Sequence, residues 1–338
     1  MVVLYYWRES FWILWGQAPT SPIVFAIHLA FSRKYATASL NMMVSTKELL
    51  PSLGRTLPML VFLSAGVFSA GVSAGVSPVS EMRDSPVKYK LRFTENFSGE
   101  KLNTKLWQRI PAGKPDWNRN MSLRDDLVSI KDGILTIRGI RNDGRDPQDV
   151  RAVLTGGIMT KDRFTMQYGK VEFRMKLGDG PKGAWPAVWM MPQTTVRGWP
   201  NDGEIDIVER LNNDAFVYQT LHYGDGTGRD LMHGGRGPIR NGEWNVYGFE
   251  WTPDELVWTV NGKRTHSWKK RPGDDELKHP WVTPYYIMFD MQLGGSWVGS
   301  VDIGALPAAM HVDWVKFYEA KQNGKTLGGF ARPRPPGM

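Results

Sequence analysis

The chain has 338 residues, enough for one large domain with a substantial core and an additional segment. Its 36 glycines, 22 prolines and 15 tryptophans favour a turn-rich β protein with aromatic surfaces. The formal net charge of +8 comes without a Lys/Arg cluster, so we expect no nucleic-acid partner. The absence of cysteine excludes disulfides, thiolate chemistry, Cys-ligated zinc and lipid attachment through a Cys.

The first part of the chain resembles an export signal. A basic segment over residues 43–55 precedes the apolar run Leu57–Phe68, and Val72-Ser73-Ala74 is a small-residue cleavage site. We therefore expect export to the periplasm, the cell surface or the medium; the alternative is an uncleaved membrane anchor over residues 57–76. The predicted parts of the chain are an extension from an overcalled start codon (1–41), a signal peptide or anchor (42–76), a linker (77–87), a β domain (88–319) and a disordered tail (320–338).

The β domain begins at Lys88 and shows short alternating segments separated by turn signals, without a long helical period. Asp132-Gly133 and Asn261-Gly262 each lie between two such segments and predict tight hairpins. Tyr168–Leu177 alternates apolar and charged residues, as expected of a half-buried antiparallel strand. Arg109–Arg124 is predicted to be a long loop of the kind that holds substrate. The pattern predicts an all-β protein, a β-sandwich.

Three acids are concentrated in one predicted strand, residues 203–210. Glu204 and Asp206 are two apart and point to one face of a strand, but strict alternation would send Glu209 into the core. A β-bulge near residues 207–208 would return Glu209 to the face of the other acids and avoid a buried unpaired charge. The two Glu carboxyls then end about 5 Å apart, the separation of a retaining glycosidase. A solvated acidic face is the alternative, although clustered like charges on one strand face are destabilising.

These residues resemble a known family. Glu-Ile-Asp-Ile-Val-Glu at 204–209 has the form of the signature of glycoside hydrolase family sixteen, in its bulged, laminarinase-like version. The segments 183–192, 290–297 and 312–318 are similar to a tryptophan-bearing strand and the last two strands of that family. The resemblance covers about residues 88–319 and implies the concanavalin-like jelly roll with an open cleft across the concave sheet, which suits internal cleavage of a polysaccharide.

The resemblance also implies roles for the acids. Glu204 is expected to be the nucleophile, Glu209 the acid and then the base, and Asp206 the residue that orients Glu204. No cofactor is required. A structural calcium near the first strand, together with an acid such as Asp313, is an option that the family offers, and solvated acids are the alternative.

Candidate substrate-binding residues flank the acids. Trp185 and Trp189 are four apart on one predicted strand face and are expected to be sugar platforms, because an indole matches the apolar face of a pyranose; packing in the core is the alternative. The remaining candidates come from the loop before the acids, the strand after them and the end of the last cleft strand: Trp199, His222, Gln292 and Trp297. His222 is expected to hydrogen-bond a carboxylate or the sugar.

The alternatives concern reaction and substrate. A transglycosylase would use the same residues, whereas a non-catalytic lectin on the same fold would have no use for all three acids. The laminarinase-like form points to β-1,3- or mixed β-1,3/1,4-glucan, and residues 290–297 with the Trp117-Asn118 loop are similar to members that cut β-1,4-galactosyl bonds in poly-N-acetyllactosamine of mucin O-glycans. Agars and other galactans also lie within the family's range. We expect a polysaccharide or glycan as the partner and a monomeric protein.

Overall fold

The computed structural model describes residues 24–30, 39–45 and 86–332. The contacts divide the chain into two units, with the boundary between Val79 and Ser80. In the first unit, β1 (Val24–Ala30) and β2 (Ser39–Ser45) form a two-stranded antiparallel sheet. The predicted cleavage site and the apolar run 57–76 lie outside the described residues. Within the described residues, no helix is long and apolar enough to cross a membrane.

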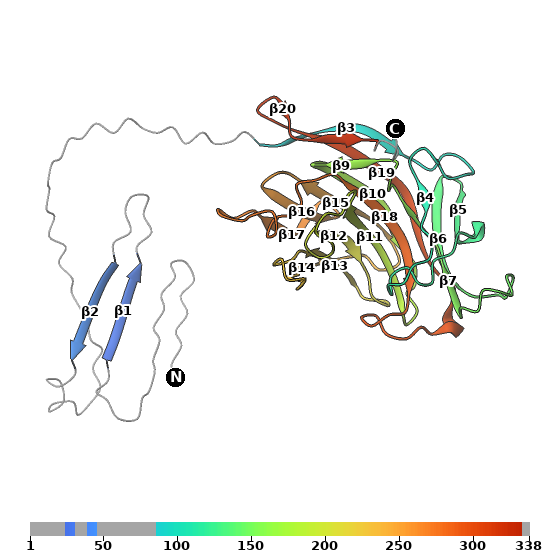
Figure 1. The fold of residues 1–338 in the computed structure, drawn as a ribbon, viewed down its shortest axis with the longest axis horizontal. Coiled ribbons are helices and arrows are strands. Elements are labelled where there is room, and N and C mark those ends of the chain that lie inside the picture. The colour runs from blue at the N-terminus through green and yellow to red at the C-terminus, as the bar shows by residue number, and fades with distance from the viewer. Residues whose placement is uncertain (1–23, 31–38, 46–85, 333–338) are drawn as a thin grey trace. The chain divides into compact units, whose positions relative to one another are not determined.

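The second unit consists of two antiparallel sheets (Figure 1). We call the first the β10 sheet; its strands in spatial order are β17 (Lys263–Lys269), β16 (Glu255–Val260), β15 (Trp244–Trp251), β10 (Gly169–Leu177), β19 (Ala308–Gln322), β6 (Ile134–Arg141) and β5 (Val128–Lys131), with β3 (Lys88–Glu95) and β20 (Lys325–Thr326) on β19 and β7 (Val153–Thr155) on β6. The second, the β12 sheet, contains β14 (His233–Pro238), β13 (Phe216–His222), β12 (Glu204–Glu209), β11 (Ala184–Pro192), β18 (Tyr285–Leu293), β8 (Gly157–Met159) and β4 (Gln108–Arg109), and in addition β9 (Thr165–Gln167) with β21 (Gly329–Ala331). The described helical elements are short 3₁₀ turns at Asp125–Leu127 and Ile303–Ala305.

The core lies between the two sheets. Along β10 every second residue is buried, as the alternation of its sequence predicts. Phe173 of β10 meets Phe289 of β18 edge to face, with ring centroids 5.2 Å apart. The inward side chains of both sheets therefore form one apolar layer, and the predicted β-sandwich is confirmed.

The two predicted hairpins are present. Asp132 and Gly133 join β5 to β6 with φ values of 51° and 74°, and Asn261 and Gly262 join β16 to β17 with φ values of 51° and 76°. Positive φ at both positions is what a two-residue turn between twisted strands requires, and Asn, Asp and Gly adopt it most readily.

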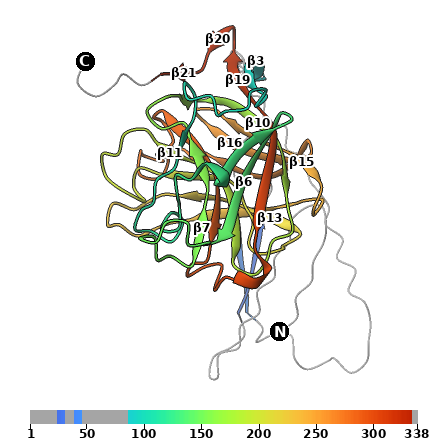
Figure 2. The ribbon, with the colours of Figure 1, turned by 90° about the vertical axis from the view of Figure 1, so that its right-hand side faces the viewer.

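The predicted disordered tail is wrong for residues 320–331. Strand β19 continues to Gln322, and Ala320 is buried where β19 pairs with β3. Beyond it, β21 pairs with β9, and the ring of Phe330 stacks on Phe164 with centroids 5.4 Å apart. Figure 2 shows β20 and β21 at the end of the sandwich where β3 and β19 lie. Glycine, proline and basic residues in the segment 320–338 suggested disorder, but one aromatic anchor and a free strand edge fix the position of residues 320–331.

Candidate active site

The predicted bulge lies at the centre of β12. Asp206 pairs with Thr220 of β13 and Glu209 pairs with Tyr218, so two residues of β12 stand opposite one residue of β13. The two residues of the bulge, Ile207 and Val208, are both fully buried. The bulge therefore keeps two consecutive apolar side chains in the core and returns Glu209 to the face of the other acids.

The three carboxylates open into one cavity of about 520 Å³ on the outer face of the β12 sheet. Its walls are mainly aromatic, and the lining residues are Pro115, Trp117, Trp185, Trp189, Met191, Trp199, Glu204, Asp206, Glu209, Tyr286 and Gln292. Asp206 and Glu209 are 2% and 8% exposed, whereas Glu204 is partly exposed. An apolar cavity with a few convergent polar groups is the usual form of a small-ligand site.

Each glutamate receives a hydrogen bond from a different indole. Trp199 Nε1 donates to Glu204 Oε2 at 2.8 Å, and Trp185 Nε1 donates to Glu209 Oε1 at 3.0 Å. The two tryptophans therefore lie at the carboxylates themselves, where a bound sugar ring would have to be. Trp199 is 54% exposed, so its ring is also free to contact a ligand.

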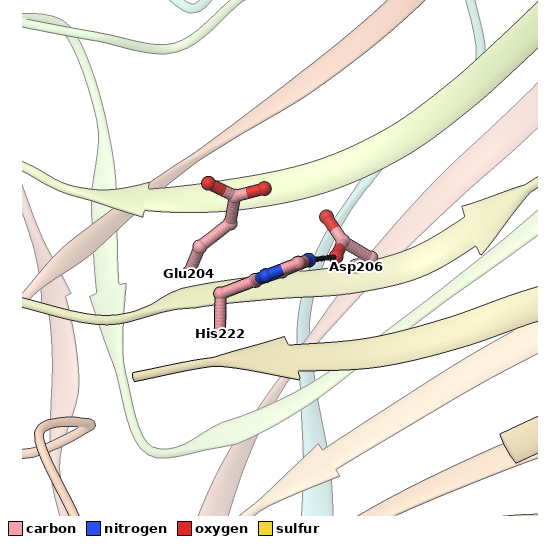
Figure 3. Close-up of side chains that lie close together, drawn as sticks. All are labelled: Glu204, Asp206 and His222. Atoms are coloured by element: carbon pink, nitrogen blue, oxygen red, sulfur yellow. Dashed lines mark ion pairs between the residues drawn. The ribbon is translucent and has the colours of Figure 1, made fainter. Parts of the chain in front are cut away.

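His222 lies beside Asp206 on the neighbouring strand (Figure 3). Its Nε2 is 3.2 Å from Asp206 Oδ2, and its Nδ1 is 2.7 Å from Oδ2 of Asp230. The predicted contact between His222 and a carboxylate is thus present, whereas His222 is not among the residues that line the cavity. Glu204, Asp206 and His222 bring ligand-type atoms within 4.8 Å of one another, a composition that could also hold a cation. Both nitrogens of His222 already face carboxylates, so this group is better explained as an internal ion pair.

Burial and mutual repulsion control the proton affinity of the two glutamates. Burial, followed by the charge of Asp206, raises the pKa of Glu204 to about 8, while His222 and the Trp199 indole act to lower it. Burial, followed by the charges of Asp206 and Glu204, raises the pKa of Glu209 well above its ordinary value. Glu209 is the less exposed of the two and is not part of the group that Glu204 forms with Asp206 and His222, so we infer that a proton shared by the pair resides on Glu209.

A fourth carboxylate lies beneath the cavity and was not singled out from the sequence. Asp290 of β18 is fully buried; Trp189 Nε1 donates to its Oδ2 at 2.8 Å and Gln292 Nε2 donates to its Oδ1 at 2.9 Å. Burial raises the pKa of Asp290 to about 7. Asp290 therefore fixes two lining side chains, and the Gln292 Oε1 is left without a protein partner. An Asp within the apolar run 285–293 is the signal that could have identified it.

The other predicted binding residues differ in position. Trp189 is only 6% exposed, so it forms a wall of the cavity rather than an open platform. Trp297 is 46% exposed and does not line the cavity; its ring meets the edges of Trp185 and Tyr218, with centroids 5.4 and 5.0 Å apart, and so lies at the rim. Trp117, which contacts Trp189 edge to face at 4.8 Å, comes from the long loop in which substrate contacts were expected.

The fold offers little support for calcium at Asp313. Its carboxylate forms an ion pair with Arg174 of β10, so a cation there would have to displace the guanidinium. Asp313 also belongs to no group of three or more metal-binding side chains among the described residues. The structural calcium remains a prediction.

Comparison with known proteins agrees with this geometry. The profile of "Glycosyl hydrolases family 16" matches residues 120–316. The keratan-sulfate endo-1,4-beta-galactosidase of Sphingobacterium multivorum is 30% identical over 239 residues, covering 68% of this chain and 55% of that protein. The beta-glucanase of Rhodothermus marinus is 32% identical over 257 residues, covering 71% of this chain and 88% of that protein. The X-ray structure of the laminarinase from Rhodothermus marinus superposes with a TM-score of 0.63 at 27% identity, covering 70% of this chain and 99% of that one.

Proposed function

Because this chain belongs to glycoside hydrolase family sixteen, we propose that it is a retaining endo-β-glycosidase that hydrolyses internal bonds of a β-linked polysaccharide or glycan. The observation that carries the proposal is the position of Glu204 and Glu209 on one face of β12, in a cavity walled by tryptophan. The chain spans only about half the length of the keratan-sulfate enzyme that it matches, so the activity of that whole protein is not transferred.

In the first step, Glu204 attacks the anomeric carbon and forms an ester with the sugar, while the bond from that carbon to the leaving oxygen breaks. Glu209 gives its proton to the leaving oxygen, so that a neutral hydroxyl departs. The Trp199 indole, which donates to Glu204 in the free protein, holds the attacking carboxylate in place. No cofactor takes part.

In the second step, Glu209 acts as the base. Once Glu204 is esterified its negative charge is gone, so the pKa of Glu209 falls and the ionised form becomes accessible. Glu209 removes a proton from a water molecule, the resulting hydroxide attacks the anomeric carbon, and the Glu204 carboxylate is released. Two displacements at one carbon return the original anomeric configuration.

The proposal includes two substrate classes and favours neither over the other. The beta-glucanase relative and the laminarinase structure support a β-glucan, for which the sequence predicts β-1,3 or mixed β-1,3/1,4 linkages. The keratan-sulfate relative supports β-1,4-galactosyl bonds in poly-N-acetyllactosamine, as found in mucin O-glycans. A difference of one axial or equatorial hydroxyl is decided by a few hydrogen bonds. Gln292, which lines the cavity, is one side chain that we propose for this role, although its unpartnered Oε1 is buried in the free protein.

The test is mass spectrometry of the products after the protein is incubated separately with laminarin, mixed-linkage glucan, agarose, keratan sulfate and desialylated mucin. A ladder of oligosaccharides from one of them, absent with Glu204→Gln, is expected and would identify the substrate. Products longer than the substrate would instead indicate a transglycosylase. If wild type and Glu204→Gln both bind a glycan and neither cleaves it, the protein is a lectin and not a hydrolase.

Export accompanies the proposal. The basic, apolar and small-residue segments between residues 43 and 74 support a cleaved signal peptide, and a polysaccharide substrate requires an enzyme outside the cytoplasm. N-terminal sequencing of protein recovered from the exported fraction should begin close to residue 75. A start before residue 40 would contradict this assignment.

A further inference from the structure

The second partner of His222 comes from outside the β12 strand. Asp230 follows β13 in the loop that leads to β14; Gly224 and Asp230 form a bridge, and Leu231 N donates to Tyr223 O at 2.8 Å. The Asp230 side chain is 24% exposed and its Oδ2 lies 2.7 Å from His222 Nδ1. The loop is therefore tied back onto the end of β13, with its carboxylate directed at the histidine.

The arrangement determines the charge of His222. A neutral imidazole has one N–H donor and one bare nitrogen that can only accept. In this structure Nε2 faces Asp206 and Nδ1 faces Asp230, and an ionised carboxylate can only accept. When both carboxylates are ionised, the geometry favours a proton on each ring nitrogen, which makes His222 an imidazolium held between two carboxylates.

We propose that Asp230 is a positioning residue that keeps His222 cationic beside Glu204, so that the seating of loop 224–232 controls the charge state of the attacking carboxylate. The inference rests on the proposed function, because it assigns Glu204 as the nucleophile.

Within the described part of the chain, His222 is the one cation that pairs with the carboxylates around it. From β12, Glu204 and Asp206 face the ring, and Glu209 also interacts with its charge; from the loop, Asp230 faces it. Among the described residues, no Lys or Arg forms an ion pair with any of these four carboxylates. On β14, His233 pairs with Leu221 and its ring instead contacts His266 and Trp268.

Asp230 acts on charge more than on geometry. With Asp230 neutralised, the tautomer protonated at Nε2 would still direct its N–H at Asp206 Oδ2, 3.2 Å away, and the ring would keep its position. Only the proton on Nδ1, which faces Asp230, would be bound less tightly. The hydrogen bonds and charges of Asp206, Glu204 and Asp230 together raise the pKa of His222 to about 10 against the opposing effect of burial. Removing one of these three charges should lower that pKa.

The test is an NMR titration of ring-labelled His222 together with the pH profile of kcat/KM for wild type, Asp230→Asn and Asp230→Glu. The control is Asp225→Asn, an exposed acid of the same loop whose side chain bonds only to Thr227. His222→Gln assigns the resonance among the six histidines.

We expect Asp230→Asn to lower the pKa of His222 by at least about one unit, because a single nearby charge typically contributes that much. Its kcat/KM should fall, and the fall should grow with pH as the variant loses the imidazolium earlier than wild type. Asp230→Glu should restore most of both properties, and Asp225→Asn should resemble wild type. If Asp230→Asn does not fold, Asp230→Ser provides the same uncharged comparison.

An unchanged His222 pKa in the uncharged variant would overturn the inference. A lowered pKa with an unchanged pH profile would show that the charge of His222 does not serve Glu204, and would overturn it equally. A protein that cleaves no glycan but shows the lowered pKa would contradict the proposed function while leaving the link between Asp230 and His222 intact.

Discussion

The outer faces of the two sheets differ in how their acids are paired around the central strands β10 and β12. On β10, Lys170 lies 2.9 Å from Glu172 and 3.4 Å from Glu250 of the next strand, and Arg174 pairs with Asp313. On β12, three acids share one face, and the one cation in the described structure that forms an ion pair with any of them is His222.

This difference in the pairing of acids with bases distinguishes an unreactive sheet face from a reactive one. Acids that are each matched by a base remain ionised at little cost, and exposed pairs of this kind contribute about 0–1 kcal/mol. Acids that outnumber their cations in a buried site must share protons, which raises their pKa values, as at Glu204 and Glu209. The chemistry therefore follows from the imbalance of charge, and the strand pattern alone would not show it.

The largest effect is expected at the nucleophile. Glu204→Gln should reduce kcat by at least about 10⁴-fold, because no other group can form the glycosyl ester. The matched substitution on the other sheet, Glu172→Gln, should leave kcat within about twofold, since Glu172 pairs with Lys170 in the β10 sheet and does not line the cavity. Initial rates on the identified glycan measure both. A Glu204→Gln variant with turnover near that of wild type would refute the assignment.

Glu209→Gln should reduce kcat on the natural glycan by about 10²–10⁴-fold, the usual contribution of a general acid and base. On a substrate with an activated leaving group, formation of the glycosyl-enzyme should recover because the leaving oxygen no longer needs a proton. Hydrolysis of that intermediate should stay slow, and a burst followed by a slow steady state should appear in stopped-flow traces. Equal loss on both substrates would remove Glu209 from the acid role.

The same substitution should stabilise the fold. The folded-state pKa of Glu209 is raised, so its contribution to stability is present below about pH 4.5 and is lost as pH rises toward the folded-state pKa. At pH 7, Glu209→Gln should therefore raise the unfolding free energy by about 0.5–2 kcal/mol, and at pH 4 it should change little. Urea titrations at the two pH values decide this, and Glu172→Gln should show no such gain.

A smaller effect on stability is expected at His266, a half-buried histidine without a carboxylate partner among the described residues. Burial, followed by the charge of His233, lowers the pKa of His266 to about 4, and its Nε2 has no partner. The stability that His266 contributes is present above about pH 6.5 and is lost as pH falls toward 4. His266→Gln should remove about 1–2 kcal/mol of pH-dependent stability in that window. Parallel urea titrations of wild type and variant at pH 7 and 4.5 measure it, and identical pH dependence would contradict it.

Most of the fold and the three acids at the centre of the site could be predicted from the sequence. Glu209, one residue out of register, was sufficient to predict the bulge, because a buried unpaired carboxylate would be too costly. Hairpin positions followed from Asp132-Gly133 and Asn261-Gly262, where the backbone itself needs positive φ.

Other features depend on pairing between distant segments, which a local pattern does not contain. Asp290 matters because β18 pairs with β11 and brings it to Trp189, about a hundred residues away. Asp230 matters because its loop folds back onto β13. The tail beyond residue 320 was predicted from composition, whereas its position depends on the pairing of β21 with β9 and on the Phe330 ring packed on Phe164.

We propose that Glu204 forms a covalent bond to the sugar while Glu209 supplies and removes the proton. The most direct measurement is to trap the intermediate with a 2-deoxy-2-fluoro glycoside of the identified sugar, digest the protein and sequence the labelled peptide by mass spectrometry. We expect one sugar per chain, attached to Glu204. Label on Asp206 or Glu209, or no label with a product of inverted anomeric configuration, would contradict it.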